Sequence, residues 1–152
     1  MSRIRPIQDV RQLQSKAYSL DMPFHMFVLE WIVNDKKYLK GKACEDLTIT
    51  ERNDIIRAIS LNIYWQPVIL LYEGYDDEAK QVFTVIRGSK VIDTILGFIK
   101  DDNKDTPELI VYSELASTEV DWIESRKLRI IIYENLTERE KIALKMLSAG
   151  VQ

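Results

Sequence analysis

The sequence predicts an α+β domain in which helices cover a small mixed β-sheet. Segments of helical period alternate along the chain with short apolar or alternating segments of strand length. Two of the helix starts carry a Thr-x-x-Glu capping box, first at Thr48 and Glu51 and again at Thr137 and Glu140. The length of 152 residues suits a single domain.

Residues 1–42 are expected to form an N-terminal helical extension, with a short helix over 9–18. A stronger amphipathic helix is predicted over 23–34, with Pro23 in its first turn. An apolar stripe of this kind usually belongs to the core, but it can also dock a partner if the core is complete without it. The aromatic residues of the stripe, Phe24, Phe27 and Trp31, are therefore candidate partner-binding residues.

Residues 43–152 are expected to form the domain itself as one compact unit. A polar connector over 35–47 leads into it, and Asn62 is expected to end its first helix. The remaining predicted elements are strands at 67–72 and 81–86 joined by a hairpin loop at 74–80, a helix at 89–100, a strand at 108–113, a helix at 118–125, a strand at 127–133, and a last helix stopped by Gly150.

Composition excludes several classes of site. His25 is the only histidine and Cys44 the only cysteine, so neither a zinc site nor an internal disulfide is expected. No metal or cofactor is predicted, and His25 is expected on a helix surface or in the core. No apolar run reaches the roughly 18–20 residues of a membrane span, and the N-terminus lacks the apolar region of a signal peptide. A cytoplasmic protein with no membrane partner is therefore expected.

The charge distribution makes nucleic acid a weak partner. The net charge is −3, whereas an autonomous nucleic-acid binder is usually basic. Residues 1–42 nevertheless hold 8 Lys/Arg against 4 Asp/Glu, and this part can contact phosphates. The cations of this alternative, a DNA-binding module, are Arg3, Arg5, Arg11, Lys36, Lys37, Lys40 and Lys42.

Three segments carry a resemblance to a known family. Thr50-Glu51 stands where a T-x-E step would lie, Gln66-Pro67 at a turn into a strand, and "FTVIRGSKVIDTILGF" at a strand-to-helix signature. In this order, over roughly residues 45–150, the chain resembles the N-terminal domain of GmrSD-type restriction proteins. The resemblance implies a ParB/sulfiredoxin-like fold.

The signature loop of that family, D-G-Q-Q-R, is not retained. Its five positions fall on Arg87, Gly88, Ser89, Lys90 and Val91, so only the glycine remains. The resemblance therefore implies a degenerate scaffold without an active site, and no catalytic residue is predicted. The turn formed by Arg87, Gly88, Ser89 and Lys90 still offers cations, a hydroxyl and a helix N-terminus, and it is a candidate anion or nucleic-acid contact.

The predicted function is a non-catalytic interaction or regulatory protein that acts by binding a protein partner. The resemblance implies a phage or mobile-element setting, in regulation, defence or counter-defence. Trp65, which precedes the first long strand, is a further candidate for the partner surface. A nucleotide-dependent hydrolase or nuclease subunit is the enzymatic alternative, and it requires Arg87, Lys90, Glu51 or Asp93 to replace the lost signature.

Overall fold

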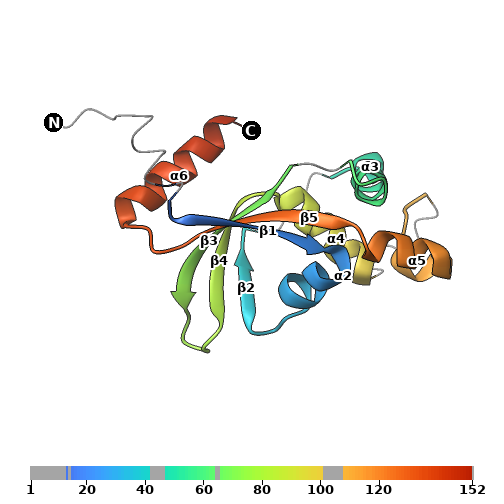
Figure 1. The fold of residues 1–152 in the computed structure, drawn as a ribbon, viewed down its shortest axis with the longest axis horizontal. Helices are drawn as coiled ribbons and strands as arrows, with labels where there is room; N and C mark the ends of the chain where they lie inside the picture. Colours follow the sequence, from blue (N-terminus) through green and yellow to red (C-terminus); the bar gives the residue numbers. More distant parts are fainter. Residues whose placement is uncertain (1–12, 14, 42–46, 64–65, 101–107, 152) are drawn as a thin grey trace.

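Residues 13, 15–41, 47–63, 66–100 and 108–151 are described by a computed structural model of the chain. They form a mixed sheet with the strand order β1-β5-β3-β4-β2 (Figure 1). β1 pairs antiparallel with β5 and β3 antiparallel with β4, whereas β5–β3 and β4–β2 are parallel. The strands are β1 Ala17–Pro23, β2 Lys37–Lys40, β3 Val68–Tyr75, β4 Gln81–Arg87 and β5 Lys127–Tyr133.

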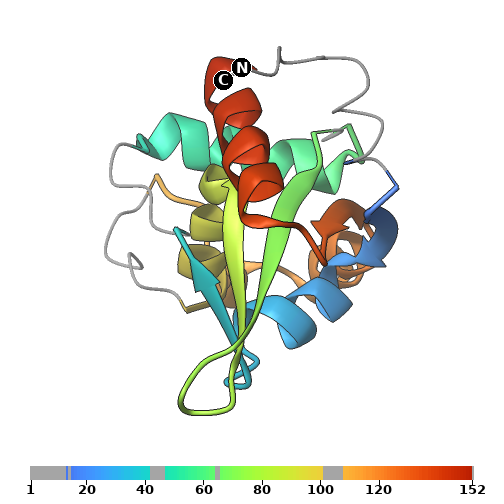
Figure 2. The same cartoon turned by 90° about the vertical axis from the view of Figure 1, so that its left-hand side faces the viewer.

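Helices lie on both faces of the sheet, which confirms the predicted α+β class (Figures 1 and 2). The helical elements are α2 Phe24–Phe27, the π-helical turn η1 Val28–Ile32, α3 Ile49–Ser60, α4 Ser89–Lys100, the 3-10 turn η2 Tyr112–Glu114, α5 Ser117–Glu124 and α6 Glu138–Val151. Helices alternate along the chain with single strands or with the β3–β4 pair, apart from η2, which lies between α4 and α5. Within the described residues, each helix is too short or too polar to cross a membrane.

The two faces of the sheet are covered unequally. One face, which we call the main face, carries the larger core cluster, where Leu70, Phe83 and Ile130 from the sheet join buried residues of α2, η1, α3, α4 and α5. The opposite face, the α6 face, carries a smaller cluster in which Leu71 and Ile86 join buried residues of other segments. Those partners are Leu13, Leu136 and Leu144.

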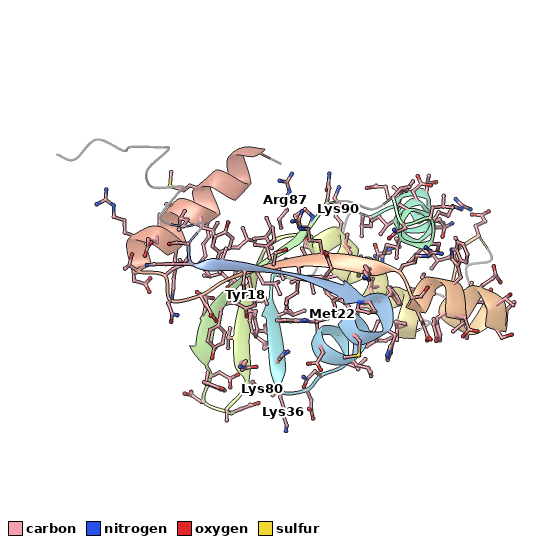
Figure 3. All side chains as sticks on the ribbon, viewed as in Figure 1. Tyr18, Met22, Lys36, Lys80, Arg87 and Lys90 are labelled. Atoms are coloured by element: carbon pink, nitrogen blue, oxygen red, sulfur yellow. The ribbon has the colours of Figure 1, made fainter. Side chains whose placement is uncertain are left out.

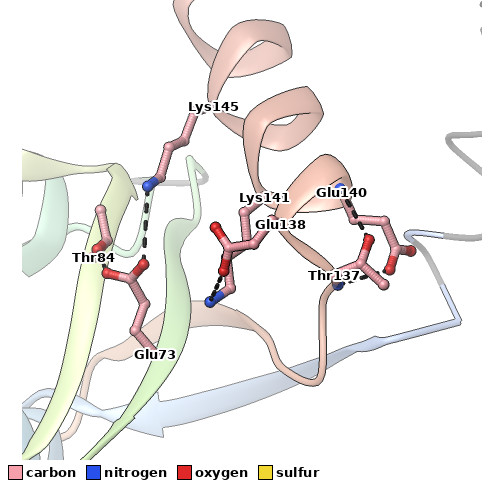
Figure 4. Close-up of polar contacts among 7 residues, drawn as sticks. All are labelled: Glu73, Thr84, Thr137, Glu138, Glu140, Lys141 and Lys145. Carbon is pink, nitrogen blue, oxygen red and sulfur yellow. Dashed lines mark hydrogen bonds and ion pairs between the residues drawn. The ribbon is translucent and has the colours of Figure 1, made fainter.

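Polar contacts hold α6 on its face (Figure 4). The predicted capping box is present, because the Glu140 N–H donates to Thr137 Oγ1 at 3.2 Å and the Thr137 N–H donates to Glu140 Oε1 at 3.0 Å. Lys145 Nζ lies 3.9 Å from a carboxylate oxygen of Glu73, and Glu73 also accepts a hydrogen bond from Thr84 on β4. Lys16 Nζ lies 2.7 Å from Glu140 Oε1, and this ion pair lowers the pKa of Glu140 below its ordinary value.

The predicted N-terminal extension is wrong as a separate unit, although its helix over 23–34 is confirmed as α2 and η1. β1 and β2 are strands of the same sheet as β3, β4 and β5, so a domain boundary at residue 42 does not divide the fold. Residues 17–18 were expected in a helix, but Tyr18, Leu20 and Met22 alternate with polar residues and lie opposite the buried side of β5. β2 lies inside the predicted polar connector, where Leu39 is the buried residue. Of the rest of the predicted helix 9–18, residues 13, 15 and 16 are described, and residues 9–12 and 14 lie outside the described part of the chain.

Later elements agree more closely with the sequence. The predicted elements α3, β3, β4, α4, α5, β5 and α6 are confirmed. Asn62, with φ +58°, ends α3 as expected: the Ile63 N–H donates to the Ala58 carbonyl and the Asn62 N–H to the Ile59 carbonyl. Gly150, predicted as the stop of the last helix, lies inside α6.

The predicted strand at 108–113 is wrong, and a buried side chain explains why. Asn53 Nδ2 donates to the Glu108 carbonyl at 2.7 Å, and Asn53 Oδ1 accepts from the Ile110 N–H at 2.9 Å. The side-chain amide of Asn53 thus makes the hydrogen bonds that the backbone of a neighbouring strand would otherwise make. The chain then turns through η2 instead of extending along the sheet.

Candidate functional site

The turn from β4 into α4 is built around Gly88. Its φ of +101° is a conformation that side chains with a Cβ rarely adopt, and a Cβ there would lie 3.1 Å from both Cα and Cγ2 of Val68. The Gly88 carbonyl accepts the Ile92 N–H at 3.0 Å, which begins the hydrogen bonding of α4. The close approach to the first residue of β3 and the positive φ therefore account for a glycine at this position.

The charged residues around this turn are matched between α3 and α4. Lys90 Nζ lies 3.6 Å from Glu51 Oε2, and Arg52 Nη2 lies 3.0 Å from Asp93 Oδ2. Arg87 is partly buried, and Figure 3 places it on the same side of the sheet as Lys90. Three of the residues proposed for anion contact or for catalysis, Lys90, Glu51 and Asp93, thus take part in ion pairs that join α3 and α4. Among the described residues, no group of three or more His, Cys, Asp or Glu is placed to hold a metal ion.

The predicted partner-binding face of residues 24–32 is wrong. Phe24 and Phe27 are 1% exposed and Trp31 is 5% exposed, and all three belong to the main core cluster. The Trp31 ring packs edge-on against Phe83 with centroids 4.7 Å apart. These aromatic residues complete the core, so they offer no docking surface. Trp65, the other residue proposed for this role, lies outside the described residues.

The basic residues of the DNA-binding alternative do not form one continuous described patch. Lys37 Nζ lies 3.4 Å from Glu30 and 4.1 Å from the centroid of the Trp31 ring, so it covers the core. Lys36 and Lys40 are exposed, and Figure 3 shows Lys36 at the same end of the molecule as Lys80. Lys80 in turn pairs with Glu78 at 3.3 Å. Arg3, Arg5, Arg11 and Lys42 lie outside the described part of the chain. His25 is exposed on α2, as expected.

A groove between α3 and α5 was not predicted, and its lining is mostly apolar. Its volume is about 600 Å³. Ile56 and Leu61 form the α3 side, Trp122 and Ile123 form the α5 side, and Ile110 lines it from the segment held by Asn53. Its polar lining is small and comes from Arg57, Ser60, Thr118 and Glu119.

Trp122 is exposed but fixed in position. Trp122 is 54% exposed, yet its indole N–H donates to the Ser60 carbonyl at the end of α3. The Arg126 guanidinium lies 3.9 Å from the centroid of the indole ring. The ring is therefore oriented by two contacts while one surface stays open to solvent, an arrangement typical of a preorganised binding residue.

The end of α3 adds apolar surface beside Trp122. Leu61 is 64% exposed and Ile63 is 60% exposed, and both flank Asn62 in the turn that ends the helix. A hydrogen-bonded turn with a left-handed residue fixes the backbone here. Apolar side chains are thus displayed on a defined backbone and not on an irregular loop.

A second set of contacts positions α5. The Tyr112 hydroxyl donates to Glu124 Oε1 at 2.5 Å, and this bond raises the pKa of Tyr112 to about 12. At the other end of the helix, the Glu119 carboxylate accepts the Ala116 N–H at 2.8 Å. The first bond braces α5 against η2, and the second closes the N-terminal turn of the helix itself.

Sequence reasoning missed this groove because its walls come from separate parts of the chain. The available signal was Trp122 in a short helix whose other exposed residues are polar or acidic, and that pattern indicates only an amphipathic helix. The chain matches no family model, no curated protein and no solved structure. The resemblance to GmrSD-type domains therefore stays a prediction.

Proposed function

We propose that this protein is a non-catalytic interaction domain that binds a helical segment of a partner protein in the groove between α3 and α5. The observation that carries the proposal is Trp122, an exposed tryptophan held by Ser60 and Arg126 at the rim of an apolar groove. Tryptophan is enriched among the residues that dominate binding energy at protein interfaces. The charged turn at Arg87 supports catalysis less well, since Lys90 and Asp93 face partners on α3.

The shape and lining of the groove favour an amphipathic helix as the occupant. Two helices form its walls, and a third helix can place apolar residues at positions i, i+3 or i+4, and i+7 between them. Leu61 and Trp122 then contact the apolar face of the bound segment from opposite sides.

Charge on the two walls favours one orientation of the bound segment. Arg57 lines the α3 wall and Glu119 lines the α5 wall. Arg57 pairs with Asp54 at 3.6 Å, but both side chains are largely exposed, so this pair contributes little and leaves Arg57 available. A partner helix with an acidic flank toward α3 and a basic flank toward α5 complements both. The regulatory role in phage or mobile-element biology is part of this proposal, and its support is the resemblance to GmrSD-type domains.

The test is a selection from a displayed library of random peptides on the immobilised wild-type protein. We expect enriched peptides to share apolar residues at helical spacing. Synthetic peptides from the selection should bind Trp122→Ala at least about tenfold more weakly, as removal of a hot-spot tryptophan does elsewhere. Lys90→Ala is the matched control, because Lys90 is exposed and lies outside the groove, and it should bind as the wild type does.

Two outcomes would overturn the proposal. One is equal binding of the selected peptides to the wild type and to Trp122→Ala. The other is a rise in melting temperature with ATP or GTP that disappears in Lys90→Ala, which would indicate that the turn between β4 and α4 binds nucleotide and would favour the enzymatic alternative.

A further inference from the structure

Among the described residues, β1 forms one edge of the sheet, and its sequence carries little of the usual protection of an edge strand. β5 is its strand neighbour, and the register runs without a bulge from Ala17 to Pro23. Edge strands are commonly protected by lysines, by prolines or by bulges. β1 contains no lysine, and its proline stands at the last position. The opposite edge, β2, is only four residues long and begins and ends with lysine.

Two hydrogen bonds at the ends of β1 show which of its backbone groups point away from β5. The Glu134 N–H donates to the Lys16 carbonyl at 3.2 Å, and the Phe24 N–H donates to the Arg126 carbonyl at 2.6 Å. In an antiparallel pair, residues alternate between bonding the neighbouring strand and facing away from it. Even-numbered residues therefore bond β5, and the N–H and C=O groups of Ala17, Ser19 and Asp21 point toward the free edge.

The side chains show that the apolar main face continues to this edge and stops there. Leu20 lies opposite Ile130 and Tyr18 lies opposite Ile132, and both residues of β5 are buried. Tyr18 is nevertheless 42% exposed and Leu20 is 38% exposed. Figure 3 shows Tyr18 and Met22 along this strand. A strand added beyond β1 would bury the apolar side chains that the present sheet leaves half open.

We propose that this edge pairs antiparallel with β1 of a second copy of the chain, about a two-fold axis at Leu20. The centre of the seven-residue strand is Leu20, so this register overlaps the whole of both strands. Leu20 faces Leu20 of the second copy, and Tyr18 faces the partner's Met22 on the main face. Ser19 and the partner's Asp21 then exchange backbone hydrogen bonds across the axis.

Polar side chains on the other face favour a second copy in this register. Ser19 Oγ already accepts a hydrogen bond from Arg129 Nε at 3.2 Å, so its own proton is available to the carboxylate of the partner's Asp21. A register centred on Asp21 would oppose two carboxylates, which destabilises a strand pair. Pro23 falls opposite Ala17 at the end of the ladder, where its carbonyl can accept the Ala17 N–H and its missing N–H removes only the outermost bond.

The first test uses the full chain and combines sedimentation with amide hydrogen exchange. We expect a monomer–dimer equilibrium, with the amides of Ser19 and Asp21 exchanging more slowly as protein concentration rises. The Leu20 amide bonds β5 within one copy, so its exchange should not depend on concentration. A monomer at all concentrations would overturn the proposal, and so would a dimer in which the Ser19 and Asp21 amides stay unprotected.

Variants then separate the edge from other surfaces. Leu20→Lys places two ammonium groups across the axis, and we expect the Kd of the dimer to rise at least about tenfold. Tyr38→Lys is the matched control, because Tyr38 is an exposed aromatic residue on the opposite edge strand. Equal weakening by both variants would contradict the assignment to β1.

A second pair of variants tests the backbone directly. Ser19→Pro removes an outward N–H without removing a bond to β5, and Ser19→Ala keeps that N–H while removing the hydroxyl. We expect the proline variant to weaken the dimer more than the alanine variant does. If Ser19→Pro fails to fold, Leu20→Lys and the exchange data still decide the question. No residue that lines the groove between α3 and α5 lies on β1, so this test is independent of the proposed function.

Discussion

Two short helical segments of this protein each carry a tryptophan, and the fold treats them in opposite ways. Residues 24–32 bury Trp31 to 5% exposure, whereas α5 leaves Trp122 at 54%. Both segments are amphipathic, and the first has the stronger aromatic stripe. The comparison teaches that the strength of an apolar stripe does not indicate whether it forms core or interface.

The strand order explains why Trp31 is buried and Trp122 is exposed. β1 and β2 lie at opposite edges of the sheet, and residues 24–32 connect them. This connection has to cross the main face, so its apolar side packs onto the strands. α5 instead enters β5 from beyond the end of the sheet and buries only Ile123. A helix that crosses a sheet thus buries its apolar stripe against the strands, whereas one that stands beside the sheet leaves part of its apolar surface open.

The largest expected effect compares the two tryptophans directly. Trp31→Ala should lower the free energy of unfolding by about 3–5 kcal/mol, because it leaves a large cavity in the core. Trp122→Ala should lower it by about 1 kcal/mol, from the lost bond to Ser60 and the lost contact with Arg126. Urea denaturation of both variants measures the difference.

A third variant checks that the loss at Trp31 is one of packing. Trp31→Phe keeps most of the ring and removes an indole N–H that has no acceptor among the described residues. Trp31→Phe should therefore lower the free energy of unfolding clearly less than Trp31→Ala does. Similar losses of unfolding free energy in Trp31→Ala and Trp122→Ala would contradict the assignment of Trp31 to the core and Trp122 to the surface.

The next effect concerns the turn that places α4 against the buried segment. Phe98 of α4 packs on Phe24 with ring centroids 6.1 Å apart. Gly88→Ala should destabilise the protein by about 2–3 kcal/mol, because of its positive φ and of the short approach to Val68. Gly74→Ala is the control: its φ is +94°, but no atom lies within 4 Å of the added Cβ, so only the backbone cost of about 1 kcal/mol is expected. Thermal unfolding of both variants measures the difference. Equal losses of stability in Gly88→Ala and Gly74→Ala would show that the contact with Val68 is unimportant.

Local signals in the sequence predicted local structure well. The two Thr-x-x-Glu boxes and Asn62 mark helix ends because capping depends on residues within a single turn. The hairpin of β3 and β4 was also predictable from apolar runs flanking a polar loop. β1 was missed because the helical spacing of Val10, Leu13 and Ala17 took precedence over the alternation of Tyr18, Leu20 and Met22.

The site could not be predicted in the same way. The groove depends on how far apart α3 and α5 stand, and that distance is set by contacts between residues distant in the sequence. Asn53 illustrates this, since its amide binds the backbone of residues 108 and 110 and so fixes one wall of the groove. The sequence around Asn53 shows only a polar residue within a helix.

A smaller effect tests that connection. Asn53→Ala should lower the free energy of unfolding by about 2 kcal/mol, because the Ile110 N–H and the Glu108 carbonyl lose their partner. The neighbouring Asp54→Ala, on the exposed side of α3, should change it by less than about 0.5 kcal/mol. Hydrogen exchange at Ile110 measures the local consequence, and an unchanged rate in Asn53→Ala would contradict the role assigned to Asn53.

The smallest expected effect lies at the brace of α5 and is seen by titration. Glu124 accepts the hydrogen bond of Tyr112 and raises the pKa of its hydroxyl from 10.0 to about 12. A raised pKa means that the folded protein favours the protonated phenol. The contribution to stability is therefore complete below pH 10 and is lost as the pH rises through about 12.

The phenolate absorbance of the wild type minus that of Tyr112→Phe isolates this one titration. Its midpoint should lie near 12, and Glu124→Gln should move it toward 10.0 because the carboxylate charge is gone. A midpoint near 10.0 in the wild type would show that the bond does not form in solution. In that case α5 would lose its polar contact with η2, and the position of Trp122 would depend on its contacts with Ser60 and Arg126 and on the burial of Ile123, which is less favourable to a preorganised groove.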